Sequence, residues 1–258
     1  PWRMWIRLHY ICLALLLLLH LHYVSAQCKK WNTCQHDGAG HLTVSSNNVD
    51  CEDCDSLKSV KITDSVTTLG GSPFQHCRNL KKIVVGKGLL ALEAQFCMNC
   101  DNLEEIVMPP DDSALTEIQS QALRSTGKLN SISIPKTVII VGNSAFRDSG
   151  LKEVVMPPDD GALTTLGPNA FWGTGKLKSI NIPNTVTTFG EYLFANSGLV
   201  VLRIPDSVTS PIKRVCDGCK LLKAAIIGDG VRELDESFTG AGYLENVTIG
   251  AGVKGMNG

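Results

Sequence analysis

Hydrophobic positions recur along this 258-residue chain at a spacing longer than any single helix or strand would give. A leucine opens each unit, and apolar residues follow three and five positions later, as in Leu177, Ile180 and Ile182. Units of this length are typical of leucine-rich solenoids, in which each unit forms one coil. The opening leucines are 22 to 26 residues apart, at Leu57, Leu80, Leu103, Leu129, Leu151, Leu177, Leu199, Leu222 and Leu244.

The last four positions of each opening phrase alternate apolar and variable residues, which is the pattern of a strand with one buried face. Ile180 and Ile182 should therefore point inward and Asn181 outward. A second apolar pair and one aromatic complete each coil, and only stacking joins such small clusters into a core. The pattern predicts a leucine-rich-repeat solenoid of about nine stacked coils, with short parallel strands on one face. Pro211 and Cys216 replace apolar and aromatic core residues in one coil, which predicts a local distortion.

The N-terminus has the pattern of a secretory signal peptide. Arg3 and Arg7 precede an apolar run over residues 11–19, and Val24-Ser25-Ala26 offers a cleavage site. A membrane anchor is the alternative, but the run is shorter than the about 20 residues that span a bilayer. We expect a signal peptide over 1–26, an N-terminal cysteine-rich cap over 27–56 and a C-terminally incomplete repeat array over 57–258. The mature fragment should carry no membrane span and be secreted or displayed on the extracellular surface.

Cysteines gather in the predicted cap. Because secretion implies an oxidising compartment, two disulfides are expected there, with their connectivity left open. Zinc is the competing interpretation, since His36 and His41 lie among the same cysteines. The candidates for these disulfides are Cys28, Cys34, Cys51 and Cys54.

The remaining cysteines follow the repeat. Cys97 and Cys100, like Cys216 and Cys219, have the spacing of redox pairs, but a redox site would need a thioredoxin-like βαβ context. Cys77 takes the same position in its coil as Cys54 and Cys100 in theirs, so neighbouring coils would bring these thiols within disulfide reach.

The remaining motifs do not indicate a binding site or a catalytic activity. The GxGxxG match at residues 250–255 recurs as a coil corner and lacks a following helix. The pairs at residues 111–112 and 159–160 are two aspartates each, and could attract calcium or form solvated turns. Since no catalytic motif is found and acidic and basic residues balance without a basic stripe, we expect no enzyme, cofactor, metal site or nucleic-acid partner.

The repeat frame resembles the BspA-like leucine-rich-repeat family from about Cys54 to the C-terminus. Residues 177–197, LKSINIPNTVTTFGEYLFANS, carry the frame, and Asn143-Ser144-Ala145-Phe146 supplies its alanine-phenylalanine step. The resemblance implies surface or secreted proteins that take part in adhesion and partner binding. It indicates the fold but not the ligand.

The variable strand positions recur once per coil and predict a continuous binding face. Its mixed chemistry suits a protein or glycan partner. A structural or matrix assembly module that self-associates, or a spacer for a missing C-terminal domain, is the alternative. Asn246 opens a glycosylation sequon. The candidate face comprises Lys82, Val84, Glu105, Val107, Ser133, Glu153, Val155, Asn181, Arg203 and Ile226.

Overall fold

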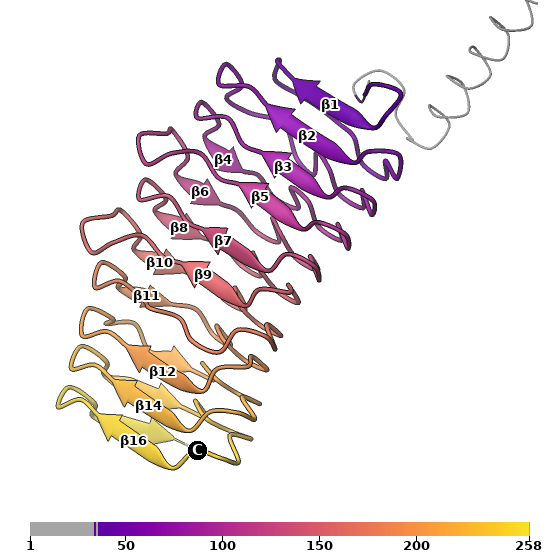
Figure 1. Cartoon of the computed structure of the whole chain (residues 1–258). Helices are drawn as coiled ribbons and strands as arrows, with labels where there is room; N and C mark the ends of the chain where they lie inside the picture. The colour runs from indigo at the N-terminus through magenta and orange to yellow at the C-terminus, as the bar shows by residue number, and fades with distance from the viewer. Residues whose placement is uncertain (1–33, 35, 258) are drawn as a thin grey trace, which may run out of the picture.

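Short parallel strands, repeated once or twice per coil, build the molecule as an elongated stack (Figure 1). The computed structural model describes residue 34 and residues 36–257, where it has seventeen strands and no helix. The predicted signal peptide and Cys28 lie outside the described residues. The predicted solenoid with parallel strands is confirmed.

The first sheet contains the strand of the leucine phrase. Neighbouring coils pair in parallel and in register, so that Val60 aligns with Ile83 and Ile83 with Ile106. Its strands are β1 (His41–Val44), β2 (Ser59–Ile62), β3 (Lys82–Val84), β5 (Glu105–Val107), β7 (Ser131–Ser133), β9 (Glu153–Val155), β12 (Val201–Ile204), β14 (Ala224–Ile227) and β16 (Asn246–Ile249).

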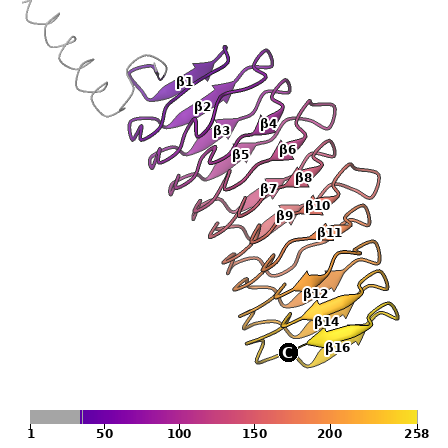
Figure 2. The same ribbon diagram turned by 180° about the vertical axis from the view of Figure 1, so that it is seen from behind.

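A second sheet runs along another side of the stack. Figure 2 shows the whole stack from behind. It forms from the second apolar pair of each coil, with Leu92, Ile118, Val141 and Leu166 buried. Its strands are β4 (Ala91–Leu92), β6 (Glu117–Ile118), β8 (Ile140–Val141), β10 (Thr165–Leu166), β11 (Thr188–Phe189), β13 (Ile212–Lys213), β15 (Glu233–Asp235) and β17 (Gly255–Asn257).

A third side, which we call the turn face, holds the coils together without strands. It follows the second sheet in each coil and runs, for example, over residues 144–148 and 169–173. Three backbone N–H groups of one coil donate to carbonyls of the next: Ser144 to Pro168, Phe146 to Ala170 and Asp148 to Trp172, at 2.8, 2.9 and 2.8 Å. Ser144 and Asp148 have positive φ, so this ladder uses left-handed backbone.

The interior is a set of columns. The opening leucines form one column and are fully buried from Leu57 through Leu222. On the turn face the rings of Phe146, Phe171 and Phe194 stack with centroids 5.3 and 5.5 Å apart. Leu123 and Cys216 fill this aromatic position in two coils and are also fully buried. Buried apolar surface stabilises a fold by about 25 cal/mol per Å². These shared columns therefore make the main contribution to stability.

The sheets are interrupted at particular coils. The first sheet breaks after β5 and again at residues 177–182, which form no strand. Each break follows a 26-residue coil that carries Met-Pro-Pro-Asp-Asp. The second sheet breaks between β11 and β13, at the coil that contains Pro211. There Ile212 is buried in place of Pro211, and Phe189 N donates to Ser210 Oγ at 2.9 Å, so the predicted distortion is confirmed.

The segment assigned to the cap contributes strand β1. His41 and Thr43 pair with Ser59 and Lys61, and Leu42 and Val44 are buried. The alternation of Leu42, Thr43 and Val44 was the available signal, although no opening leucine precedes it. The first sheet therefore begins inside the cap.

Candidate interaction surface

The outward side of the first sheet, which we call the strand face, carries two columns of variable side chains. One column passes through Lys82 and Glu105, which pair directly, and the other through Val84 and Val107. The same register recurs farther along, with Ser133 paired to Val155 and Arg203 to Ile226. The structure therefore brings the predicted face residues together in continuous rows within each segment of the sheet.

Apolar and charged groups alternate on the strand face. Val107 and Val155 are 38% and 48% exposed. Lys82 Nζ lies 2.8 Å from Glu105 Oε2, and both side chains reach solvent. Val84 and Ile226 are half-buried and offer less contact area. The strand face is therefore mixed, with exposed valines bordered by charged side chains.

The remaining face residues are accessible even where the sheet is interrupted. Asn181 is exposed between the buried Ile180 and Ile182, which confirms the predicted register in a coil without a strand. Ser133, Glu153 and Arg203 are also exposed. Asn246 begins β16 and is exposed, so its amide nitrogen is open to modification, and its glycosylation stays a prediction.

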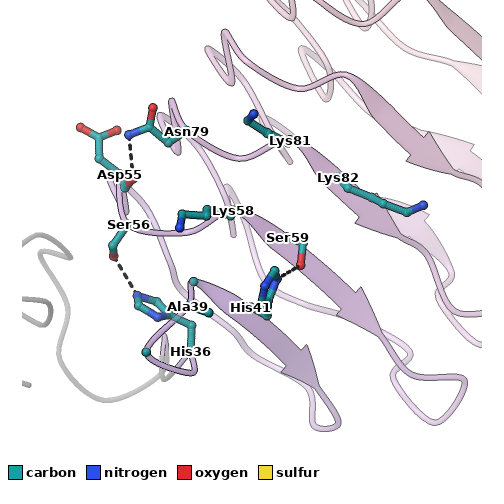
Figure 3. Close-up of a pocket in the computed structure, with 12 residues that line it drawn as sticks. His36, Ala39, His41, Asp55, Ser56, Lys58, Ser59, Asn79, Lys81 and Lys82 are labelled. Carbon is teal, nitrogen blue, oxygen red and sulfur yellow. Dashed lines mark hydrogen bonds between the residues drawn. The ribbon is translucent and has the colours of Figure 1, made fainter.

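A shallow pocket of about 700 Å³ lies at the N-terminal end of the strand face, beside the corners that lead into β1, β2 and β3 (Figure 3). Lys58, Lys81 and Lys82 line it, together with His36 and His41. Among the described residues Lys58 and Lys81 take part in no ion pair. The pocket thus adds positive charge to one end of the face.

Side chains around the pocket are held by short contacts. His36 Nε2 lies 2.8 Å from Ser56 Oγ, and His41 Nδ1 lies 2.7 Å from Ser59 Oγ. Sequence reasoning missed this pocket. The available signal was the lysine that directly follows the coil leucine at both Lys58 and Lys81, because equivalent positions of adjacent coils lie side by side.

The cap cysteines are oxidised where the structure describes them. Cys34 bonds to Cys51, with Cα atoms 4.9 Å apart, and Cys54 is also disulfide-bonded. This pairing favours the disulfide interpretation of the cap over the zinc interpretation, and both stay predictions. Cys28 lies outside the described residues, and its part in the cap stays a prediction.

Two further disulfides form within single coils, Cys97–Cys100 and Cys216–Cys219. All four residues are fully buried, which keeps them from reductants and favours a structural role over redox activity. A bridge between Cys77 and a neighbouring coil does not form, because Cys100 bonds to Cys97 instead. Cys77 is free, and burial raises the pKa of its thiol to about 12. Its Sγ donates to Cys51 O at 2.9 Å.

The aspartate pairs belong to turns. Asp111 Oδ1 accepts a hydrogen bond from Lys136 N at 3.0 Å, and Asp159 Oδ1 accepts one from Asn184 N at 2.7 Å. Each carboxylate thus satisfies a backbone donor of the following coil. This role accounts for Asp111 and Asp159 as turn residues.

A family model described as BspA type leucine rich repeat region matches residues 50–152 and 141–257, with six copies of the repeat. No curated protein matches the chain. Among solved structures, a leucine-rich repeat protein from Bacteroides ovatus ATCC 8483 is 19% identical over 86% of this chain and 72% of that chain, with a TM-score of 0.54. The T. pallidum leucine rich repeat protein is 20% identical over 78% of each chain, with a TM-score of 0.53. These likenesses concern the fold.

Within residues 36–257 no helix has the length and apolar character of a membrane span.

Proposed function

The chain belongs to the BspA-type leucine-rich-repeat family, and from this premise we propose that it is a non-catalytic, secreted or cell-surface protein that binds a protein or glycan partner through its strand face. The observation that carries the proposal is the register of the first sheet. In one segment of the sheet it sets the exposed Val107 beside Val84 and Glu105 beside Lys82, and in the next it sets the exposed Val155 beside Ser133 and Glu153 beside Ser131.

Extracellular location is supported by the N-terminal pattern and by the disulfides. Residues 1–26 have the charged, apolar and cleavage regions of a secretory signal. Cys34–Cys51, Cys97–Cys100 and Cys216–Cys219 are disulfides, which persist mainly in oxidising compartments. Cleavage should therefore fall between Ala26 and Gln27, and N-terminal sequencing of the secreted product tests this.

A protein partner fits the strand face better than a highly charged ligand does. Protein interfaces combine an apolar centre with a polar rim. Here the valines supply the apolar centre, and Lys82, Glu153 and Arg203 supply polar surroundings. Side chains at these positions can change without altering the buried leucines, so one scaffold can present different specificities.

The test compares two pairs of substitutions at equally exposed apolar residues. Val107→Asp with Val155→Asp changes the strand face. Leu90→Asp with Ile139→Asp changes residues that are 48% and 40% exposed beside β4 and β8 of the second sheet. Binding of labelled protein to immobilised extracellular-matrix extract is then measured for both variants. Loss of interface hot spots costs about 2 kcal/mol or more, so the strand-face variant should bind more than about tenfold more weakly.

The control pair should bind as the unmodified protein does, with both variants folded by circular dichroism. Equal binding by the strand-face variant, with loss in the control pair, would move the site to the second sheet. A concentration series in light scattering addresses the assembly alternative, because a polymerising module self-associates without any ligand.

A further inference from the structure

Three potential metal ligands meet on the turn face, away from the strand face. Glu52, Asp53 and His76 each offer one ligand atom, and the three atoms lie within 4.8 Å of one another. Two come from one coil and the third from the next. Asp53 and His76 occupy equivalent coil positions, and their backbones are joined through the adjacent residue, because Asp53 N donates to Gln75 O at 2.8 Å.

The backbone around the three residues is firmly held. Glu52 and Asp53 lie between Cys51 and Cys54, both of which are disulfide-bonded. His76 N donates to Met98 O at 2.8 Å, and the next residue, Cys77, is fully buried. A site held in this way loses little conformational entropy when an ion binds.

The spacing of the ligand atoms suits a small divalent ion. His76 Nδ1 lies 3.3 Å from Asp53 Oδ1, and the side chains are 30% and 26% exposed. A charge-assisted hydrogen bond would be shorter, at about 2.7–2.9 Å. Two ligands on a tetrahedral ion with bonds of 2.0–2.1 Å would be separated by roughly 3.3–3.4 Å. The observed separation of His76 Nδ1 and Asp53 Oδ1 is therefore compatible with two ligands of one ion.

His76 is also the only histidine in the described residues that faces carboxylates in this way. Both ring nitrogens of His36 are engaged, with Asp37 O at 2.6 Å and Ser56 Oγ at 2.8 Å. His41 Nδ1 contacts Ser59 Oγ. The cluster is thus a mixed set of one imidazole and two carboxylates rather than a group of acidic residues alone.

We propose that Glu52, Asp53 and His76 bind a zinc-like divalent cation that joins the cap to the first coil. Imidazole with carboxylates suits zinc and its neighbours among the transition metals, whereas calcium prefers six to eight oxygen ligands. Three protein ligands leave a further position for water. This inference does not depend on the proposed function, because the ligands lie on a different face.

The experiment uses the full chain with its disulfides intact and zinc chloride as the probe in titration calorimetry. One equivalent of zinc should bind. His76→Asn and Glu52→Gln should each weaken binding by at least about tenfold, since even residues that only support metal ligands act on that scale. Asparagine also accepts the positive φ of 60° at His76, so this variant should fold. Matched controls are His41→Asn and Glu104→Gln, which should bind zinc as the unmodified chain does.

Cobalt(II) provides a second measurement. Its visible absorption should appear on the unmodified chain and on both controls, and should be lost in His76→Asn. Circular dichroism confirms that each variant is folded. The proposal is overturned if no zinc binds, if His76→Asn binds as tightly as the unmodified chain, or if binding appears only after the disulfides are reduced. A reduction-dependent signal would assign the ion to cysteine thiolates instead.

Discussion

The strand face and the turn face both join neighbouring coils through backbone hydrogen bonds, but they use different backbone. On the strand face the bonds run in both directions along the stack: Lys81 N donates back to Lys58 O, and Val85 N donates forward to Val107 O. On the turn face they run only forward, as from Phe146 N to Ala170 O. Extended strands accept most side chains at outward positions, whereas the turn face repeats left-handed positions.

The difference restricts one column of the turn face. Left-handed backbone favours glycine and short polar residues, and one turn-face column consists almost entirely of these. At two of its positions the side chain of one coil occupies the space beside a glycine of the next: Asp148 beside Gly173, and Asn196 beside Gly218. The strand face repeats no left-handed position, so its outward residues carry no such requirement.

The largest expected effect lies in the aromatic column of the turn face. The ring of Phe171 is fully buried between Phe146 and Phe194. Phe171→Ala should lower the free energy of unfolding by about 3–5 kcal/mol, as the loss of a buried aromatic does. Urea denaturation measures the change. A loss below about 1 kcal/mol would mean that the column does not pack as a unit.

The strand face should separate inward from outward residues just as sharply. Ile182 is buried and Asn181 beside it is exposed. We expect Ile182→Ala to cost about 2–5 kcal/mol and Asn181→Ala to stay within about 0.5 kcal/mol. Chemical denaturation of both variants tests this in the coil that forms no strand. Similar losses in the two variants would show that the alternation is lost there.

The register and the buried columns could be predicted from the sequence because they repeat. Each opening leucine fixes the phase of its coil, so the burial of Ile180 and Ile182 follows from spacing alone. The pairing of cysteines could not be predicted in this way. Cys100 has one candidate partner in its own coil, Cys97, and another in the neighbouring coil, Cys77, and only the three-dimensional path of the chain selects Cys97.

The turn-face ladder and the metal ligands were missed for a related reason. Asp53 and His76 are one coil apart in the sequence, and a comparison of equivalent coil positions would have aligned them. The repeat is defined by its apolar residues, whereas Asp53 and His76 share no residue type that would make their position recur as a motif. The hydrogen-bond ladder of the turn face was also hard to predict, because its left-handed residues follow neither a helical nor a strand period.

A smaller effect should distinguish two glycines of the same turn. Gly173 has a φ of 72°, and an added Cβ would meet the carboxylate of Asp148, whereas a Cβ on Gly175 would meet nothing within 4 Å. Gly173→Ala should cost about 1–2 kcal/mol from left-handed backbone alone. Gly175→Ala should change stability by less than about 0.5 kcal/mol. Thermal and urea denaturation compare the two, and equal costs would remove the steric argument for the turn face.

The smallest effect is expected for the ion pair on the strand face. Lys82 and Glu105 lie 2.8 Å apart, but their side chains are 46% and 53% exposed. Water and salt screen such a pair, and holding two long side chains in one geometry costs entropy. A double-mutant cycle with Lys82→Met and Glu105→Gln should give a coupling of about 0.2–1 kcal/mol that shrinks as salt is added. A coupling above about 2 kcal/mol would show that the pair stabilises the fold. The expected small value would instead mean that both charges can exchange their mutual contact for a partner at little cost to folding, as a recognition surface requires.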